Sequence, residues 1–192
     1  MQSGTSIAAA DEVAVYDGSS STIYWYYNGS DNAAPAGWYD SNYNPSATAL
    51  IAPHQGVVIK RKVSGNVNIT MVGSVKTGNT LFPVQPGLNV LGTVSASGLT
   101  LATSGLYTGS ATTGMKGSTQ PATADELTIY TSTSQLNYWY YDGSDNAAPA
   151  GWYDVNYNTA GTQPIAPGSA IVLNRKAPGV AFNWVLPSPT SF

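Results

Sequence analysis

The chain has 192 residues, of which 42% are hydrophobic and only 9% charged, and its formal net charge is -3 at pH 7. This composition excludes a highly charged disordered tail, and its one basic cluster, at 60–62, is too short to predict nucleic-acid binding. No stretch approaches the roughly 20 apolar residues of a membrane-spanning helix, and the lack of cysteine excludes disulfides, zinc–thiolate sites and a thiol nucleophile.

From the N-terminus, residues 1–10 lack the basic start and apolar stretch of a secretory signal, so an export signal is expected to be missing from this chain. Short segments with strand-like composition then alternate with turn dipeptides such as Asn28-Gly29 and Asp142-Gly143. No segment predicts a helix. The strands expected in the first part of the chain are 12–16, 23–27, 56–62, 67–75 and 88–94.

The sequence contains a long internal repeat. The segment Gly-Ser-Asp-Asn-Ala-Ala-Pro-Ala-Gly-Trp-Tyr-Asp occurs at 29–40 and again at 143–154, and the same spacing of 114 residues aligns 1–78 with 115–192 without a gap. An internal similarity of this length indicates a duplication.

Residues 79–114 precede the second copy and have no counterpart before the first. We therefore expect an all-β fold of two tandem homologous antiparallel modules, each sandwich-like or barrel-like: an incomplete module at 1–78 and a second at 79–192 that includes leading strands from 79–114. The alternative is that 79–114 is a linker. Without those strands, the first module should expose an unpaired sheet edge.

Aromatic residues occur at matching positions of the two copies. Exposed Trp and Tyr rings stack on sugars while neighbouring Asp and Asn bind hydroxyl groups, so these rings predict either two carbohydrate platforms or an aromatic β-core or protein interface. The rings are those of Trp25, Tyr27, Trp38, Tyr39, Trp139, Tyr141, Trp152 and Tyr153.

Oxygen-bearing side chains alternate after each Gly-Trp-Tyr segment, as they do at the start of a calcium loop. The Gly and Glu that complete an EF-hand are replaced by Pro45 or Thr159 and by Ile51 or Ile165. A calcium site and hydrogen-bonded Asx turns both remain open as interpretations. The residues are Asp40, Asn42, Asn44, Asp154, Asn156 and Asn158.

Catalytic residues are scarce. His54 is the only histidine and Gly168 replaces it in the second copy, so a Ser-His-Asp triad would exist in one copy only. The repeated carboxylates allow a glycoside-hydrolase pair in principle, but Asp11 and Glu12 begin a strand and can pair with the basic residues after position 60. We expect a non-enzymatic protein without a cofactor, calcium aside.

The combination of Ala-Asp-Glu, Tyr-Trp-Tyr-Tyr, Gly-Trp-Tyr-Asp, Ile-Ala-Pro and a following strand that ends in Arg-Lys resembles an uncharacterised group of secreted, internally repeated β-proteins from environmental bacteria of verrucomicrobial type. The resemblance covers most of both copies. It implies export and a β-rich repeat, and the group has no established activity to transfer.

Two functions are predicted from these features. The first is an extracellular structural subunit that self-associates into a homopolymer such as a filament, sheath or surface layer; the second is a module that binds polysaccharide. For the first, the strand-like segment 179–186, with Phe182 and Trp184, is a candidate to pair with the open edge of a neighbouring chain in a head-to-tail filament. The alternative is that this segment pairs inside its own module, in the position that 67–73 takes in the first copy.

Overall fold

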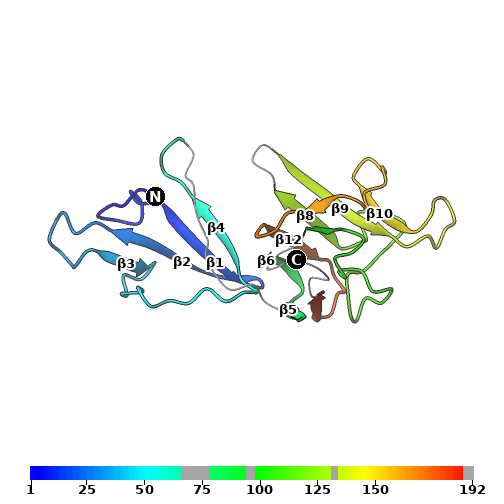
Figure 1. Cartoon of the computed structure of the whole chain (residues 1–192), viewed down its shortest axis with the longest axis horizontal. Helices are drawn as coiled ribbons and strands as arrows, with labels where there is room; N and C mark the ends of the chain where they lie inside the picture. Colours follow the sequence, from blue (N-terminus) through cyan, green and yellow to red (C-terminus); the bar gives the residue numbers. More distant parts are fainter. Residues whose placement is uncertain (66–77, 94–97, 131–133, 188–192) are drawn as a thin grey trace.

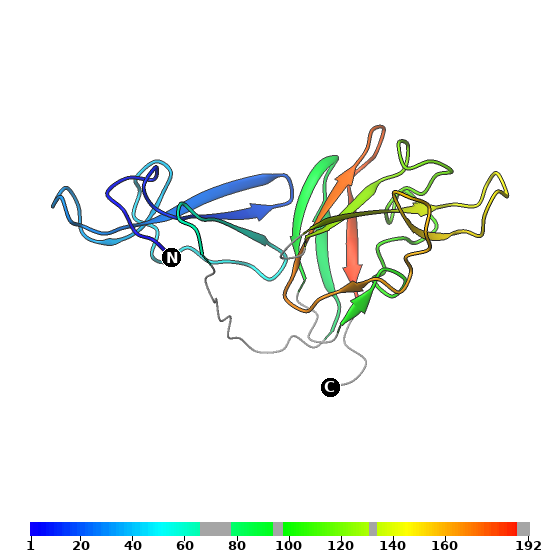
Figure 2. The same ribbon diagram turned by 90° about the horizontal axis from the view of Figure 1, so that it is seen from above.

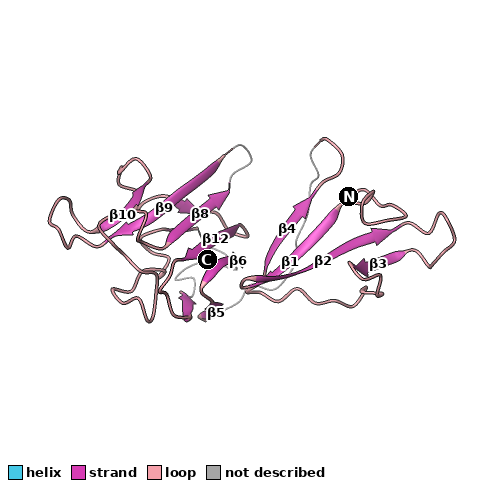
Figure 3. Cartoon of the chain, turned by 180° about the vertical axis from the view of Figure 1, so that it is seen from behind, coloured by secondary structure: helices cyan, strands magenta, loops and turns pink. Residues whose placement is uncertain are grey.

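The computed structural model describes residues 1–65, 78–93, 98–130 and 134–187. These residues form strands, turns and loops, and no helix occurs among them (Figure 3). Consequently, none of the described segments is a helix long and apolar enough to cross a membrane. The predicted all-β class is confirmed, while the strand expected at 67–75 lies outside the described residues.

In the first half of the chain, residues 1–65, four strands form one antiparallel sheet. Their spatial order is β3-β2-β1-β4, and β1 is paired with β2 on one side and with β4 on the other. Among the described residues, β4 pairs with no other strand over its length. The strands are β1 (Glu12–Asp17), β2 (Ser20–Tyr27), β3 (Gly37–Asp40) and β4 (Gly56–Lys60).

In the second half, residues 78–187, the larger sheet has five strands in the order β10-β9-β8-β12-β6. They are β6 (Gly87–Gly92), β8 (Glu126–Tyr130), β9 (Gln135–Tyr141), β10 (Gly151–Asp154) and β12 (Ala170–Arg175). Four of these strands occupy the repeat positions of β3, β2, β1 and β4 in the same spatial order. The fifth, β6, comes from 79–114 and covers the edge of β12.

Two smaller antiparallel sheets complete the second half. One pairs β5 (Thr80–Val84) with β13 (Phe182–Leu186), and the other pairs β7 (Leu99–Thr100) with β11 (Pro164–Ile165). The sequence did not predict β5, because Pro83 interrupts its pattern and proline is tolerated only where a strand has a free side. Here β5 has one strand partner and so accommodates it.

Local turn chemistry fixes the hairpins of both halves. Gly29 and Gly143 have φ angles of 73° and 74°, as expected for the second residue of the Asn-Gly and Asp-Gly dipeptides. The segments that follow them turn back to form β3 and β10, each of which pairs with the aromatic strand before it.

The main hydrophobic core lies in the second half, where the five-stranded sheet packs against the smaller sheets and the segment 99–107. β13 is part of this core. Phe182 and Trp184 are buried, the rings of Trp184 and Phe82 lie 4.8 Å apart, and the Trp184 Nε1–H donates to the Ser104 carbonyl at 2.8 Å. The candidate assembly strand is therefore already engaged within its own half, and donating it to a neighbour would expose both rings.

The two halves meet at β6, with the strands of the first half at one end of the long axis and those of the second at the other (Figures 1 and 2). The outer edge of β6 donates from the Val90 amide to the Gly18 carbonyl at 3.2 Å and from the Gly92 amide to the His54 carbonyl at 3.4 Å. A Cβ atom on Gly56 would lie 2.5 Å from the Val90 side chain, so only glycine permits this approach. One edge of β6 thus pairs with β12 in the second sheet, and its other edge contacts the first half.

Candidate assembly interface

One face of each large sheet carries the same aromatic cluster. In the first half, Trp25 packs edge-to-face against Tyr27 at 6.0 Å and donates from Nε1 to the Asp40 carbonyl at 3.0 Å. In the second half, Trp139 makes the corresponding contacts at 5.9 Å and 3.0 Å. The loop that precedes β1 or β8 covers each cluster through a buried alanine, Ala10 or Ala124.

These clusters account for most of the rings that the sequence singled out. Seven of the eight are buried in the fold, and Trp38 is half-buried. A ring that stacks on a sugar needs an open face, whereas these rings pack on one another and on the chain. The seven buried rings are therefore packed within their own half, and Trp38 lies on the face of the first sheet described below.

The predicted calcium loops are held together by hydrogen bonds. Asp40 Oδ1 accepts the backbone amides of Asn42 and Asn44 at 2.8 and 2.9 Å, and Oδ2 accepts the Asn44 side-chain amide. The Asn44 side chain is the main cause of the lowered pKa of Asp40. Asp154 repeats the arrangement with Asn156 and Asn158. This is Asx-turn geometry. Within the described ranges, no three His, Cys, Asp or Glu side chains gather where they could hold a metal ion.

A buried carboxylate ties the start of each repeat to the end of its fourth strand. Asp11 accepts the backbone amides of Lys62 at 2.8 Å and Gln2 at 2.7 Å, and Arg61 donates to it at 3.1 Å. These donors, chiefly the Lys62 amide, hold the pKa of Asp11 below its ordinary value. Asp125 occupies the same position in the second half.

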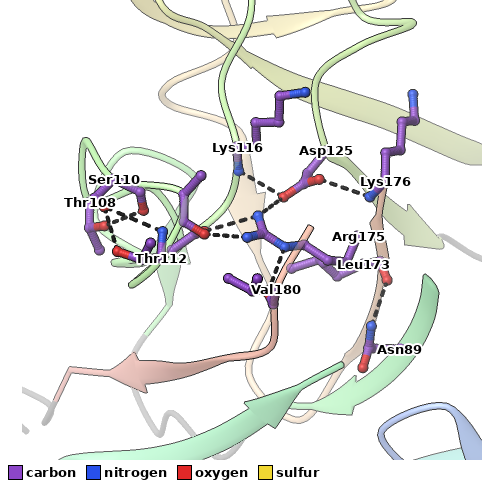
Figure 4. Close-up of polar contacts among 12 residues, drawn as sticks. Asn89, Thr108, Ser110, Thr112, Lys116, Asp125, Leu173, Arg175, Lys176 and Val180 are labelled. Atoms are coloured by element: carbon purple, nitrogen blue, oxygen red, sulfur yellow. Dashed lines mark hydrogen bonds and ion pairs between the residues drawn. The ribbon is translucent and has the colours of Figure 1, made fainter. Parts of the chain in front are cut away.

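The arginine partners of these carboxylates differ between the halves, and Figure 4 shows the network of the second half. Arg175 is fully buried: it donates to Asp125 and to the carbonyls of Ala111, Gly114 and Val180. Two of these carbonyls belong to 79–114. Arg61 is partly exposed and donates to Asp11 and to the Gly65 carbonyl. The extra segment thus completes the polar network of the second half only.

The opposite face of the second sheet, here called the covered face, is sealed by the main core. Side chains on β8, β9, β10 and β12 share this face because Leu127 lies opposite both Tyr138 and Leu173 in the register. Residues from β5, β7, β13 and the segment 99–107 pack on them. The covered face consists of Leu127, Tyr138, Trp152, Ile171 and Leu173, all buried.

The matching face of the first sheet, here called the uncovered face, lacks that layer among the described residues. It consists of Val13, Tyr24, Trp38, Val57 and Ile59, and each is only half-buried. The register is the same, since Val13 lies opposite both Tyr24 and Ile59. Val15 is buried, but it belongs to the end of the sheet that approaches β6. An apolar sheet face of this kind is normally packed against another layer.

The rim of the uncovered face is more exposed still. Leu50 and Ile51 are 90% and 57% exposed, whereas Ile165, at the repeat position of Ile51, is 1% exposed because β11 pairs with β7. Tyr26 is 38% exposed, and among the described residues its aromatic contact is with Trp38. Exposed apolar side chains grouped in this way mark a candidate interaction surface.

Sequence reasoning missed this surface, because the two copies carry apolar residues at the same positions. The informative signal was the missing counterpart of 79–114, which predicted an incomplete first half. It predicted an open edge, whereas within the described residues the structure shows a face and a rim that no second layer covers.

The comparisons with known proteins add no relative. No family model matches this chain, and neither does any of the curated proteins or solved structures with which it was compared.

Proposed function

We propose that this chain is a non-enzymatic structural subunit that assembles through the uncovered face of its first half. The observation that carries the proposal is the contrast between the halves: side chains at equivalent register positions are buried in the second half and half-buried or exposed in the first. Covering the uncovered face would remove apolar surface from water, at about 25 cal/mol per Å².

The proposal includes the origin and location of the subunit. The two halves are tandem homologous modules, sandwich-like in the second half and without the second layer in the described part of the first. The resemblance to secreted, repeated β-proteins supports an extracellular location and a homopolymer such as a filament, sheath or surface layer. The low content of charged residues, 9%, is consistent with a surface that becomes buried in an assembly.

Sedimentation velocity of the full chain over a wide range of concentration, combined with negative-stain electron microscopy, tests this function. We expect the wild type to associate as its concentration rises. Ile59→Asp, on the uncovered face, should remain monomeric. Val58→Asp is the matched control, because the neighbouring side chain points to the opposite side of the same strand and is already exposed. A wild-type chain that remains monomeric throughout would refute the proposal.

A further inference from the structure

We infer that the uncovered face is a docking site for a polypeptide segment with the chemistry of residues 98–107, supplied by another polypeptide that carries this repeat. The inference rests on the proposed role of the uncovered face as an assembly surface and specifies the chemistry of the segment that would cover it. The second half shows what covers an equivalent face. Three features that residues 98–107 contact in the second half recur in the described part of the first half without such a contact. The uncovered face also continues an existing contact, since its sheet already touches β6 through Gly18 and His54.

The first feature is a strand position that pairs with no strand in the described part of the chain. In the second half, β11 pairs with β7, and the amides of Leu101 and Ala102 donate to the carbonyls of Gln163 and Gly161 at 3.0 and 2.9 Å. The repeat positions of these two acceptors are Ala49 and Ala47, beside the exposed Leu50 and Ile51. An incoming extended segment can bond to this backbone as β7 does, by strand addition.

The second feature is an aromatic ring, that of Tyr26, on which no other ring of the described residues stacks. In the second half, Tyr140 and Trp152 meet edge-to-face at 5.6 Å, and Tyr107 stacks on Tyr140 with ring centroids 3.4 Å apart and planes 12° from parallel. Tyr26 and Trp38 reproduce the edge-to-face pair at 5.6 Å. An incoming aromatic ring in the position of Tyr107 can therefore stack on the outer face of Tyr26.

The third feature is the apolar face itself. Leu99, Leu101 and Leu106 are buried against the covered face as part of the main core. The uncovered face presents the same kind of side chains in the same register and lacks these three leucines. A segment that reads Gly-Leu-Thr-Leu-Ala-Thr-Ser-Gly-Leu-Tyr, as 98–107 does, supplies the strand, the leucines and the ring together.

Residues 98–107 of the same chain cannot supply the segment, because the second half already uses them. Moving them would uncover one face in order to cover another. A polypeptide that carries the same repeat and has its own copy of this segment free can cover the face without that loss.

Two constructions test the inference on the full chain. In the first, a second copy of 79–114 is fused directly before Met1, which reproduces the connection that leads from 79–114 into Met115 and gives the segment a high effective concentration. In the second, a synthetic peptide of residues 98–107 is added to the unmodified chain. The matched control for both carries Leu101→Asp, Leu106→Asp and Tyr107→Ser in the added segment.

Hydrogen exchange read by mass spectrometry is the main measurement. We expect the added segment to slow amide exchange at Leu50 and Ile51 at least about ten-fold, with the control segment giving no change. The peptide should also dissociate oligomers formed by the unmodified chain. Tyr26→Ala should weaken peptide binding, whereas Val58→Ala, on the other side of the sheet, should not.

The outcomes separate this inference from the proposed function. If the chain self-associates but neither the fusion nor the peptide protects Leu50 and Ile51, the partner is wrong and the assembly function stands. The same conclusion follows if two uncovered faces pair with each other and the peptide does not compete. If the segment protects the face of a chain that remains monomeric, the inference stands and self-assembly fails.

Discussion

The contrast between the halves predicts unequal costs for the same substitution at Ile165 and Ile51, which occupy matching repeat positions. Ile→Ala removes three carbons, worth about 2.4 kcal/mol at about 0.8 kcal/mol each when fully buried. Because Ile165 is 1% exposed in the main core, the cavity left behind brings the expected loss for Ile165→Ala to about 2–5 kcal/mol. Ile51 is 57% exposed, so Ile51→Ala should cost about 1 kcal/mol or less.

Equilibrium urea unfolding, followed by far-UV circular dichroism and tryptophan fluorescence, measures these losses. The two halves can unfold in separate transitions. For each variant, the free energy of unfolding is therefore compared with that of the wild type in the transition whose midpoint the substitution shifts. Fusing the extra 79–114 segment before Met1 should raise the cost of Ile51→Ala toward that of Ile165→Ala. Equal losses for the two variants in the unmodified chain would show that the rim of the uncovered face is packed in solution, and would refute the reasoning.

Three further outcomes are expected. The contribution of Asp11 to the free energy of unfolding should be constant above about pH 5 and fall in acid, because the pKa of Asp11 is held below its ordinary value of 3.8 and its stabilisation disappears as the pH drops through the folded value; a flat acid limb in the urea midpoint would contradict this. Arg175→Met should cost about 3–5 kcal/mol by leaving the Asp125 carboxylate buried without its partner, and a thermal unfolding midpoint equal to that of the wild type would exclude this. Gly56→Ala should separate the halves by pushing against Val90, which small-angle X-ray scattering would detect as a larger radius of gyration with unchanged circular dichroism; an unchanged scattering curve would argue against the close contact.

The strand predictions succeeded where the pattern is local. The segments 12–16, 23–27, 56–62 and 88–94 correspond to β1, β2, β4 and β6, because alternating or β-branched runs bounded by turn residues specify a strand without help from distant residues. Short strands such as β7 and β11 were missed. They exist only because each finds the other across a gap of more than 60 residues in the sequence.

For the aromatic rings, residue type alone did not predict whether a side chain is exposed or buried. Trp25 and Trp139 have the side chain of a sugar platform, yet both are buried under the loop that precedes their sheet. Whether a ring is exposed depends on which segment folds over it, and composition does not contain that information.

The sequence alone determined that the chain is all-β and that 114 residues separate two copies of one pattern. Only the tertiary structure decided that Phe182 and Trp184 belong to the core of their own half, and that one apolar face is covered while its counterpart is not. The reason is physical: strand formation and turns depend on neighbouring residues, whereas burial depends on contacts between segments far apart in the chain. Ile51 and Ile165 are the same residue in the same repeat position, but Ile165 pairs with β7 and packs in the main core, whereas Ile51 is exposed.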